Sequence, residues 1–245
     1  MISPLTKRET SRLDNFYQTR PTDEMLTEVM LSYLTENSQG KNFVIISDAS
    51  AANTKQKLQS SLPGARTVNP RQGSYVDRNE VAAALSKDRP NWVILEGSNI
   101  GVLSNATSYL NSLADSYNIT LFTTNKNNSF ESDNVSHRHL SKLHFHYPSV
   151  DKEYNKNREN PFISSYMKKY GVVPNTYAVR GFDVTYDILL RLASSESLSE
   201  SMEEDFTTEY VENKFSYGKT PTGGYLNRAI YIMAYDDNME LKVVR

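Results

Sequence analysis

The 245-residue chain contains no cysteine, which excludes a disulfide framework, a thiol nucleophile and a cysteine-ligated zinc site. It has no apolar run approaching the ~20 residues that a membrane-spanning helix needs, so we expect no membrane span. Its first residues, MISPLTKRETSR, lack the apolar segment of a signal peptide, so if the protein is exported we expect its signal upstream of this chain. With 27 basic and 29 acidic residues, the chain has no basic excess for a nucleic-acid partner.

Motifs that carry catalysis or hold a cofactor are also missing. The sequence contains no G-x-G-x-x-G, no P-loop, no G-x-S-x-G nucleophile elbow and no H-E-x-x-H zinc motif. We therefore expect no cofactor, and no residues stand out as a catalytic site, although a Ser/His/Asp triad without a local motif stays open at this point. The chain does have 38% hydrophobic residues, enough for a packed core, and its length accommodates one large α/β domain or two smaller lobes.

The first part of the chain alternates between two hydrophobic patterns. Short apolar runs predict strands at 42–47, 65–69, 91–97, 119–124 and 143–147. Apolar residues at helical spacing predict helices at 25–34, 50–61, 77–85 and 103–114. Strands separated by helices form parallel sheets, so we expect a doubly wound α/β lobe with the runs NFVIIS, NWVILEG and ITLFTT in its interior.

The pattern changes after Pro148. A charged, Asn-rich stretch at 150–160 is interpreted as a linker that crosses between lobes. Two helices follow, one ending at Gly171 and one beginning at Pro174. The acidic stretch 194–205 predicts a solvated loop or a frayed helix start. Later segments indicate strands at 215–217, 225–235 and 241–244, with turns at 222–224 and 236–238.

Polar residues follow three of the predicted strands, where a parallel sheet usually binds its ligand. These candidate ligand-binding residues are Asp48, Ser50, Gly97, Ser98, Thr124 and Asn125. A second interpretation stays open, because Asp, Ser, Thr and Asn are also the preferred residues for capping helices and forming loops.

Four histidines, His137, His139, His144 and His146, lie close together in the sequence. On a strand at 143–147, His144 and His146 would point to the same face, which is compatible with metal chelation. No acidic pair nearby completes a ligand set, so we expect a solvated strand surface without a metal.

Three charged residues, Arg180, Asp183 and Asp187, lie on the helix that begins at Pro174. Arg180 and Asp183 are three residues apart and are expected to pair on the helix surface. The spacing of Asp183 and Asp187 is also compatible with acid–base chemistry. We expect these residues to form a solvated helix face.

Several sequence phrases resemble type I periplasmic binding proteins of the branched-chain amino-acid receptor group. They are FYQTRPTDEM, KNFVIISD, NWVILEGS, PFISSYMKKYGVVPNTYAVRGFDVTYDILLRLA and GGYLNRAIYIMAYDDNMEL. The resemblance implies a non-catalytic protein of the periplasm or cell envelope that binds a small molecule, such as an amino acid, between two lobes. The family's Tyr-Gly after the aspartate is replaced here by ASAANT at 49–54, which removes an aromatic wall of the ligand site.

The phrase GGYLN and the strand NWVILEG look closest to a cell-envelope subgroup that carries LysM peptidoglycan-binding repeats upstream. This resemblance implies envelope proteins or peptidoglycan as partners, reached through upstream sequence. An alternative function is therefore a protein-interaction or peptidoglycan-associated module whose cleft has lost its ligand role.

The resemblance also implies a division into lobes. Residues 1–147 and 222–245 are expected to form the second lobe. Residues 148–221 would be a linker and the C-terminal helices of an incomplete first lobe, whose remainder would lie upstream. In that case an apolar stripe on these helices is expected to be exposed or to pack against another copy. The stripe comprises Phe162, Tyr166, Ala178, Phe182, Ile188, Leu189 and Leu192.

Overall fold

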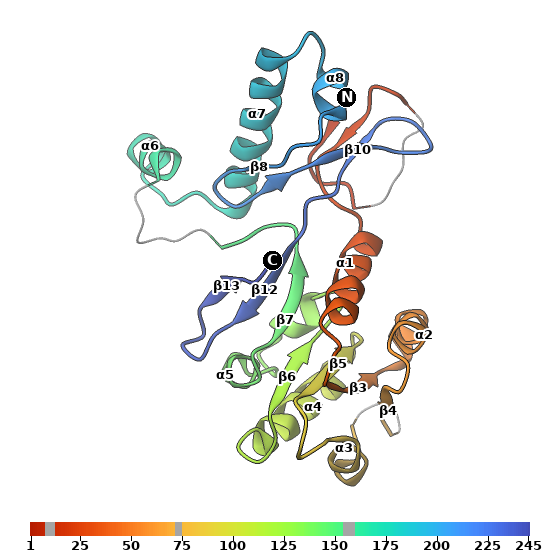
Figure 1. Cartoon of the computed structure of the whole chain (residues 1–245). Helices are drawn as coiled ribbons and strands as arrows, with labels where there is room; N and C mark the ends of the chain where they lie inside the picture. The colour runs from red at the N-terminus through yellow and green to blue at the C-terminus, as the bar shows by residue number, and fades with distance from the viewer. Residues whose placement is uncertain (8–12, 72–74, 154–159) are drawn as a thin grey trace. The chain divides into compact units, whose positions relative to one another are not determined.

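The computed structural model describes residues 1–7, 13–71, 75–153 and 160–245. They form two compact units. Unit 1 comprises Met1–Met25 and Val150–Tyr231, and unit 2 comprises Leu26–Ser149 and Ile232–Arg245 (Figure 1). Each unit therefore combines segments that are far apart in the sequence.

Unit 2 is built on a seven-stranded sheet whose interior strands are parallel. The strand order is β13 (Leu241–Val243), β12 (Tyr231–Tyr235), β7 (His146–Ser149), β6 (Ile119–Phe122), β5 (Asn91–Glu96), β3 (Asn42–Ser47) and β4 (Arg66–Val68). The neighbouring strands from β7 through β4 all pair in parallel, and at the other edge β13 pairs with β12 in antiparallel orientation. The three runs expected in the interior of the sheet, β3, β5 and β6, are interior strands.

Helices connect the strands of unit 2. They are α1 (Asp23–Glu36), α2 (Ala52–Ser61), α3 (Arg78–Ala84), α4 (Ile100–Leu113) and α5 (His137–Lys142), with short 3₁₀ helices η1 (Ala49–Ala51) and η2 (Asn128–Glu131). Met30 and Leu34 of α1 and Leu58 of α2 pack in one core with Ile94 of β5. Right-handed crossovers place α3, α4 and α5 on the opposite face, which makes the sheet doubly wound (Figure 1).

Unit 1 has a smaller, four-stranded sheet. Its order is β1 (Ile2–Ser3), β2 (Tyr17–Gln18), β11 (Tyr225–Asn227) and β10 (Tyr217–Lys219). A hairpin, β8 (Thr208–Glu209) with β9 (Lys214–Phe215), and the helices α6 (Pro161–Tyr170), α7 (Thr176–Ser194) and α8 (Leu198–Glu203) complete it. The core combines Val184 and Ile188 of α7 with aromatic side chains of the strands, Tyr17 and Tyr225 among them.

The division into units differs from the boundaries expected from the sequence, which placed 1–147 and 222–245 together. Strand β1 pairs with β2, and β2 pairs with β11, so the segments 1–25 and 222–231 belong to unit 1. The apolar segment 225–235 is not one strand but two, β11 and β12, which lie in different sheets. The expected linker, 150–160, lies partly outside the described residues.

Local signals predicted several helix ends. Asp77 caps α3 and accepts a hydrogen bond from the Glu80 backbone N–H (3.2 Å), as expected for a capping residue. Pro161 begins α6, and Gly171 ends it with a φ of 72°, in the left-handed region that favours glycine. Helix α7 begins two residues after Pro174, at Thr176, because Asn175 caps it.

Two further predictions, about a helix and a strand, were also wrong. The acidic stretch 194–205 is neither a loop nor a frayed start, because it contains α8, whose Met202 is fully buried in the unit 1 core. The expected strand 143–147 begins only at His146. Its first residues cannot extend the strand, since His144 adopts a φ of 46°.

Candidate functional site

The candidate residues follow the carboxyl ends of three neighbouring strands of unit 2. Strand β5 pairs in parallel with β3 on one side and with β6 on the other, so the three ends meet at one edge of the sheet. Asp48 follows β3, Gly97 follows β5 and Thr124 lies just after β6. The topology therefore brings together the residues that the sequence predicted as a site.

Asp48 joins two of these strand ends by hydrogen bonds. Its Oδ1 accepts from the backbone N–H (2.8 Å) and the hydroxyl (2.5 Å) of Ser50. Its Oδ2 accepts from the backbone N–H groups of Ser98 (2.9 Å) and Asn99 (2.7 Å). Burial raises the pKa of Asp48, but these hydrogen bonds outweigh burial and leave the pKa below its ordinary value. Asp48 is therefore a charged residue whose hydrogen bonds link the loop after β3 to the loop after β5.

The link that Asp48 makes between these loops requires glycine at position 97. Its φ of 139° is a conformation that residues with a side chain rarely adopt. A Cβ at this position would overlap the carboxylate of Asp48. Gly97 therefore lets the β5 loop approach Asp48 closely, and its role in the site is to make room.

Glu96 connects the third strand end to the other two. Its Oε1 accepts a hydrogen bond from the Thr124 backbone N–H (2.5 Å), and the Thr123 hydroxyl lies 3.4 Å away. Burial raises the pKa of Glu96 to about 7, although the hydrogen bonds from the threonines lower it. Asp48 adds a smaller repulsion that raises it further. This carboxyl group is buried below the edge and does not face solvent.

The outer layer of this edge consists of hydroxyl and amide groups. Ser50 and Ser98 are exposed, and the Ser98 hydroxyl lies 3.1 Å from the Ser50 hydroxyl. Asn125 belongs to the loop after β6 and is half-buried, and its backbone carbonyl accepts from the Thr123 hydroxyl (3.4 Å). Such groups hydrogen-bond to polar molecules without adding a charge.

Sequence reasoning missed two residues of this edge. Asn127 donates from its side-chain amide to the Gly97 carbonyl (2.8 Å), and the Ser129 hydroxyl donates to the Ser98 carbonyl (2.9 Å). Asn127 also caps the 3₁₀ helix η2. The cap was a detectable signal, but the partners lie about thirty residues earlier, and no local pattern encodes that pairing.

The charged residues of α7 are not a solvated helix face, contrary to the expectation. Arg180, Asp183 and Asp187 are all buried, and both aspartates are completely so. Asp183 accepts hydrogen bonds from the backbone N–H groups of Val211 (3.1 Å) and Asn213 (3.0 Å), among others. A carboxylate held in this way organises the loop between β8 and β9, and the expected surface pair with Arg180 is replaced by these interactions.

Arg180 and Asp187 likewise have internal partners. The Arg180 guanidinium donates to the backbone carbonyls of Pro4 (2.7 Å) and Thr19 (3.1 Å). Asp187 accepts from the Arg191 guanidinium (3.0 Å) and from the Thr208 hydroxyl (2.6 Å). All of these groups lie in unit 1, and they join α7 to the N-terminal segment and the β8–β9 hairpin.

The histidines do not lie on one strand face. His137 and His139 belong to α5, His144 precedes β7, and only His146 is a strand residue. The ring of His146 stacks on Phe122 with a centroid separation of 4.8 Å, and burial lowers its pKa. Within the described part of the chain, no group of three or more His, Cys, Asp or Glu side chains is arranged to hold a metal ion. In the same residues, no helix is long and apolar enough to cross a bilayer.

No protein-family model and no curated protein match the sequence. Solved structures do match the fold. An ABC transporter substrate-binding protein from Desulfitobacterium hafniense in complex with Leu is 15% identical with a TM-score of 0.52, over 94% of this chain and 67% of that chain. A branched chain amino acid ABC transporter periplasmic ligand-binding protein from Burkholderia xenovorans is 12% identical with a TM-score of 0.58, over 93% of this chain and 64% of that chain.

A leucine binding protein from Thermotoga maritima is 14% identical with a TM-score of 0.51, over 100% of this chain and 72% of that chain. The chain thus spans about two thirds of the length of the proteins that it matches. At these identities the likeness concerns the fold and not the ligand. The chain has the α/β fold of type I periplasmic binding proteins.

Proposed function

We propose that this chain is a non-catalytic ligand-binding module of the bacterial cell envelope, and that its ligand is a small polar molecule such as an amino acid. The fold supports the proposal, because two of the structural neighbours are binding proteins of ABC transporters, one of them in complex with Leu, and a third is a leucine binding protein. A periplasmic location is proposed on the same basis. Fold alone does not carry a function, so the proposal depends on the polar edge of unit 2.

The observation that carries the proposal is the arrangement of Asp48, Ser50 and Ser98. Asp48 holds the β3 and β5 loops together and thereby fixes two exposed hydroxyl groups next to each other. Binding sites need polar groups held in place by a second set of residues, and this edge has both layers. Because Asp48 is already hydrogen-bonded and Glu96 is buried, the groups offered to a ligand are uncharged.

A thermal-shift screen tests this proposal, with leucine as the first probe and the other common amino acids after it. A ligand at 100 times its dissociation constant stabilises its protein by ~2.7 kcal/mol. We expect Ser98→Ala and Asn125→Ala to reduce that shift. Ser60→Ala is the matched control, since Ser60 is an exposed serine of α2 that hydrogen-bonds within its own helix.

The proposal fails if no amino acid produces a shift, or if Ser60→Ala reduces the shift as much as Ser98→Ala does. The first result would favour the second candidate function, a protein-interaction or peptidoglycan-associated module. One observation supports that candidate: the segment 49–54, ASAANT, provides no aromatic wall at the edge, and Ser50 within it is engaged by Asp48. Envelope proteins or peptidoglycan would then be the partners.

A further inference from the structure

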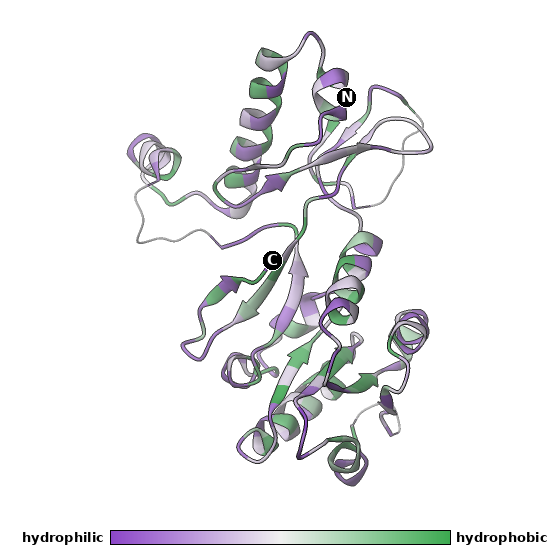
Figure 2. Cartoon of the chain, viewed as in Figure 1, coloured by the Kyte–Doolittle hydropathy of each residue, from purple (hydrophilic) through white to green (hydrophobic). Residues whose placement is uncertain are grey.

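Helix α7 buries its charged residues and exposes several of its apolar ones. All four of its charged residues, Arg180, Asp183, Asp187 and Arg191, are buried. Its outward side therefore carries no Lys, Arg, Asp or Glu. Leucines occupy that side, with Leu189 59% exposed and Leu192 49% exposed. Figure 2 shows apolar and polar bands alternating along this helix.

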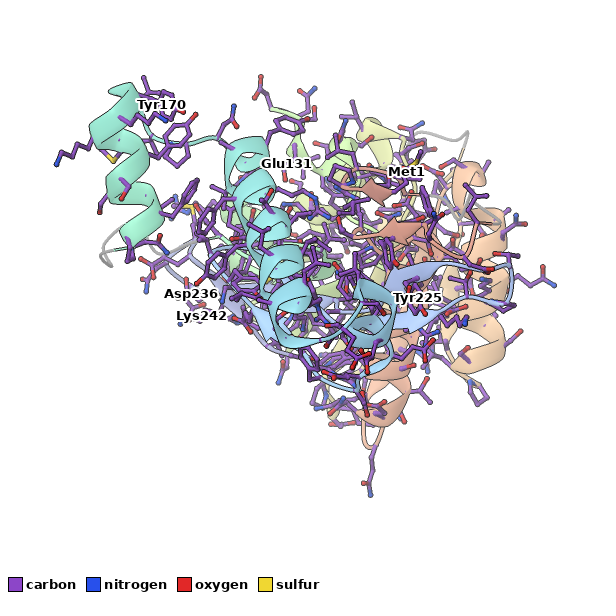
Figure 3. The ribbon with its side chains drawn as sticks, turned by 90° about the horizontal axis from the view of Figure 1, so that it is seen from above. Met1, Glu131, Tyr170, Tyr225, Asp236 and Lys242 are labelled. Atoms are coloured by element: carbon purple, nitrogen blue, oxygen red, sulfur yellow. The ribbon has the colours of Figure 1, made fainter. Side chains whose placement is uncertain are left out.

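Helix α6 adds a second apolar surface beside α7, although its last turn also carries two exposed lysines, Lys168 and Lys169. None of its residues is buried, although its apolar residues recur at helical spacing. Phe162 of α6 stacks on Phe182 of α7 with a centroid separation of 4.0 Å, and Phe182 stacks in turn on Tyr186 (5.5 Å). The side chains of α6 stand out from its ribbon, Tyr170 among them (Figure 3).

We call this combined surface the α6–α7 face. Its exposed side chains are Met167, Tyr170, Tyr186, Leu189, Leu190 and Leu192, and its half-buried ones are Phe162, Tyr166 and Phe182. It contains most of the apolar stripe predicted from the sequence. The two members outside the face are Ala178, which is small and half-buried, and Ile188, which is buried in the unit 1 core.

The area of the face is comparable to what a stable protein interface buries. At about half exposure, six large side chains of about 200 Å² each contribute on the order of 600 Å². A standard interface buries about 800 Å² on each partner. The largest apolar patch on a typical monomer is about 300–600 Å², so the area of the α6–α7 face lies at the top of that range.

We propose that a second copy of this chain covers the α6–α7 face, giving a two-fold symmetric dimer. In a two-fold interface the same surface occurs on both sides, so each face must be complementary to itself. The α7 part of the face carries no exposed charge and meets that condition without like-charge repulsion, while the flexible side chains of Lys168 and Lys169 on α6 can keep their ammonium groups in water. The α7 part of the face offers no charged group to a charged protein or an anionic membrane, because the charges of α7 point inward.

Sedimentation velocity of the full 245-residue chain tests the proposal. From low to high micromolar concentration, we expect the mass to rise twofold as the dimer forms. Leu189→Glu places a charge in the face and should keep the chain monomeric, with an unchanged circular dichroism spectrum. Leu5→Glu is the control, since Leu5 is a similarly exposed leucine (53%) of unit 1 outside the face.

A covalent test uses the absence of cysteine from the sequence. With Leu189→Cys as the sole thiol, mild oxidation should give a cross-linked dimer, and Leu5→Cys should give much less. The proposal is overturned if the wild-type chain stays monomeric at high micromolar concentration, or if Leu189→Glu still dimerises. It is also overturned if both cysteine variants cross-link equally.

Discussion

At the scale of single residues, the polar edge of unit 2 contains two carboxyl groups with opposite behaviour. Asp48 remains ionised because backbone N–H groups and a hydroxyl donate to it, and its pKa lies below the ordinary value. Glu96 has fewer donors and is buried, and its pKa rises to about 7. The different environments of the two carboxyl groups therefore keep one charge at the edge and remove the other near neutral pH.

The raised pKa of Glu96 predicts a pH-dependent stability. Between its unfolded pKa of 4.5 and its folded pKa of about 7, the folded chain holds a proton that the unfolded chain releases. Stability therefore falls as pH rises through this window, and the loss is complete above it. The shift corresponds to about 3 kcal/mol at most. Urea unfolding from acidic to mildly alkaline pH measures this slope.

Glu96→Gln should flatten this pH dependence, because an amide oxygen still accepts from Thr124 but does not ionise. Glu212 of unit 1 also has a pKa raised to about 7, with burial as the main cause, so Glu212→Gln should remove a further part. Glu28→Gln, at an exposed position of α1, is the control and should leave the slope unchanged. An unaltered slope in Glu96→Gln would show that Glu96 is ionised in the folded chain.

At the scale of elements, α7 reverses the usual relation between polarity and burial. A helix is normally anchored by its apolar side, but the anchor of α7 includes charged groups with partners on distant segments. Its remaining buried side chains, Val184 and Ile188 among them, contact the aromatic core of unit 1. The helix position therefore depends on ion pairing and hydrogen bonding as well as on apolar burial.

This reversal predicts unusual effects of substitution in α7. Asp187→Ala would leave the buried Arg191 guanidinium without its ion-pair partner, and removing one member of a buried pair costs about 3–5 kcal/mol. Leu189→Ala should cost less than about 0.5 kcal/mol in the monomer, because this leucine is already exposed. Urea unfolding at low protein concentration measures both. Equal losses, or a larger loss for Leu189→Ala, would contradict the inward orientation of the charges.

At the scale of the whole molecule, the sequence predicted the sheet better than the units. The runs NFVIIS, NWVILEG and ITLFTT are apolar enough to be buried on both faces, so their place in the interior followed from composition. The segment 225–235 also reads as one apolar run, but it crosses between units at Tyr231. Strand pairing decides that boundary, and β2 and β11 pair across about two hundred residues of sequence.

The candidate site was predictable for a related reason, and only in part. Asp48 and Ser98 could be placed at one edge because parallel strands present their carboxyl ends together. The close contact of Asp48 with Gly97 could not be foreseen, because it depends on the loop conformation of each strand end. The burial of Asp183 was missed since helical spacing shows which residues share a side, but not which side is covered.

The two units have separate cores, which predicts separable responses to cavities. Ile94 belongs to the core of unit 2, and Ile188 belongs to the core of unit 1. Replacing either with Ala removes buried methylene groups and costs about 2–5 kcal/mol. Amide hydrogen exchange should then become faster mainly in the unit that carries the substitution, because the lost contacts lie within its own core.

Peptide-resolved mass spectrometry measures exchange in β3 and β5 for unit 2 and in α7 and β11 for unit 1. The two variants serve as controls for each other, since each removes a similar volume from a different unit. If both variants accelerate exchange equally in all four elements, the two units unfold together in one cooperative transition. That result would contradict the prediction that each unit responds separately to a cavity in its core.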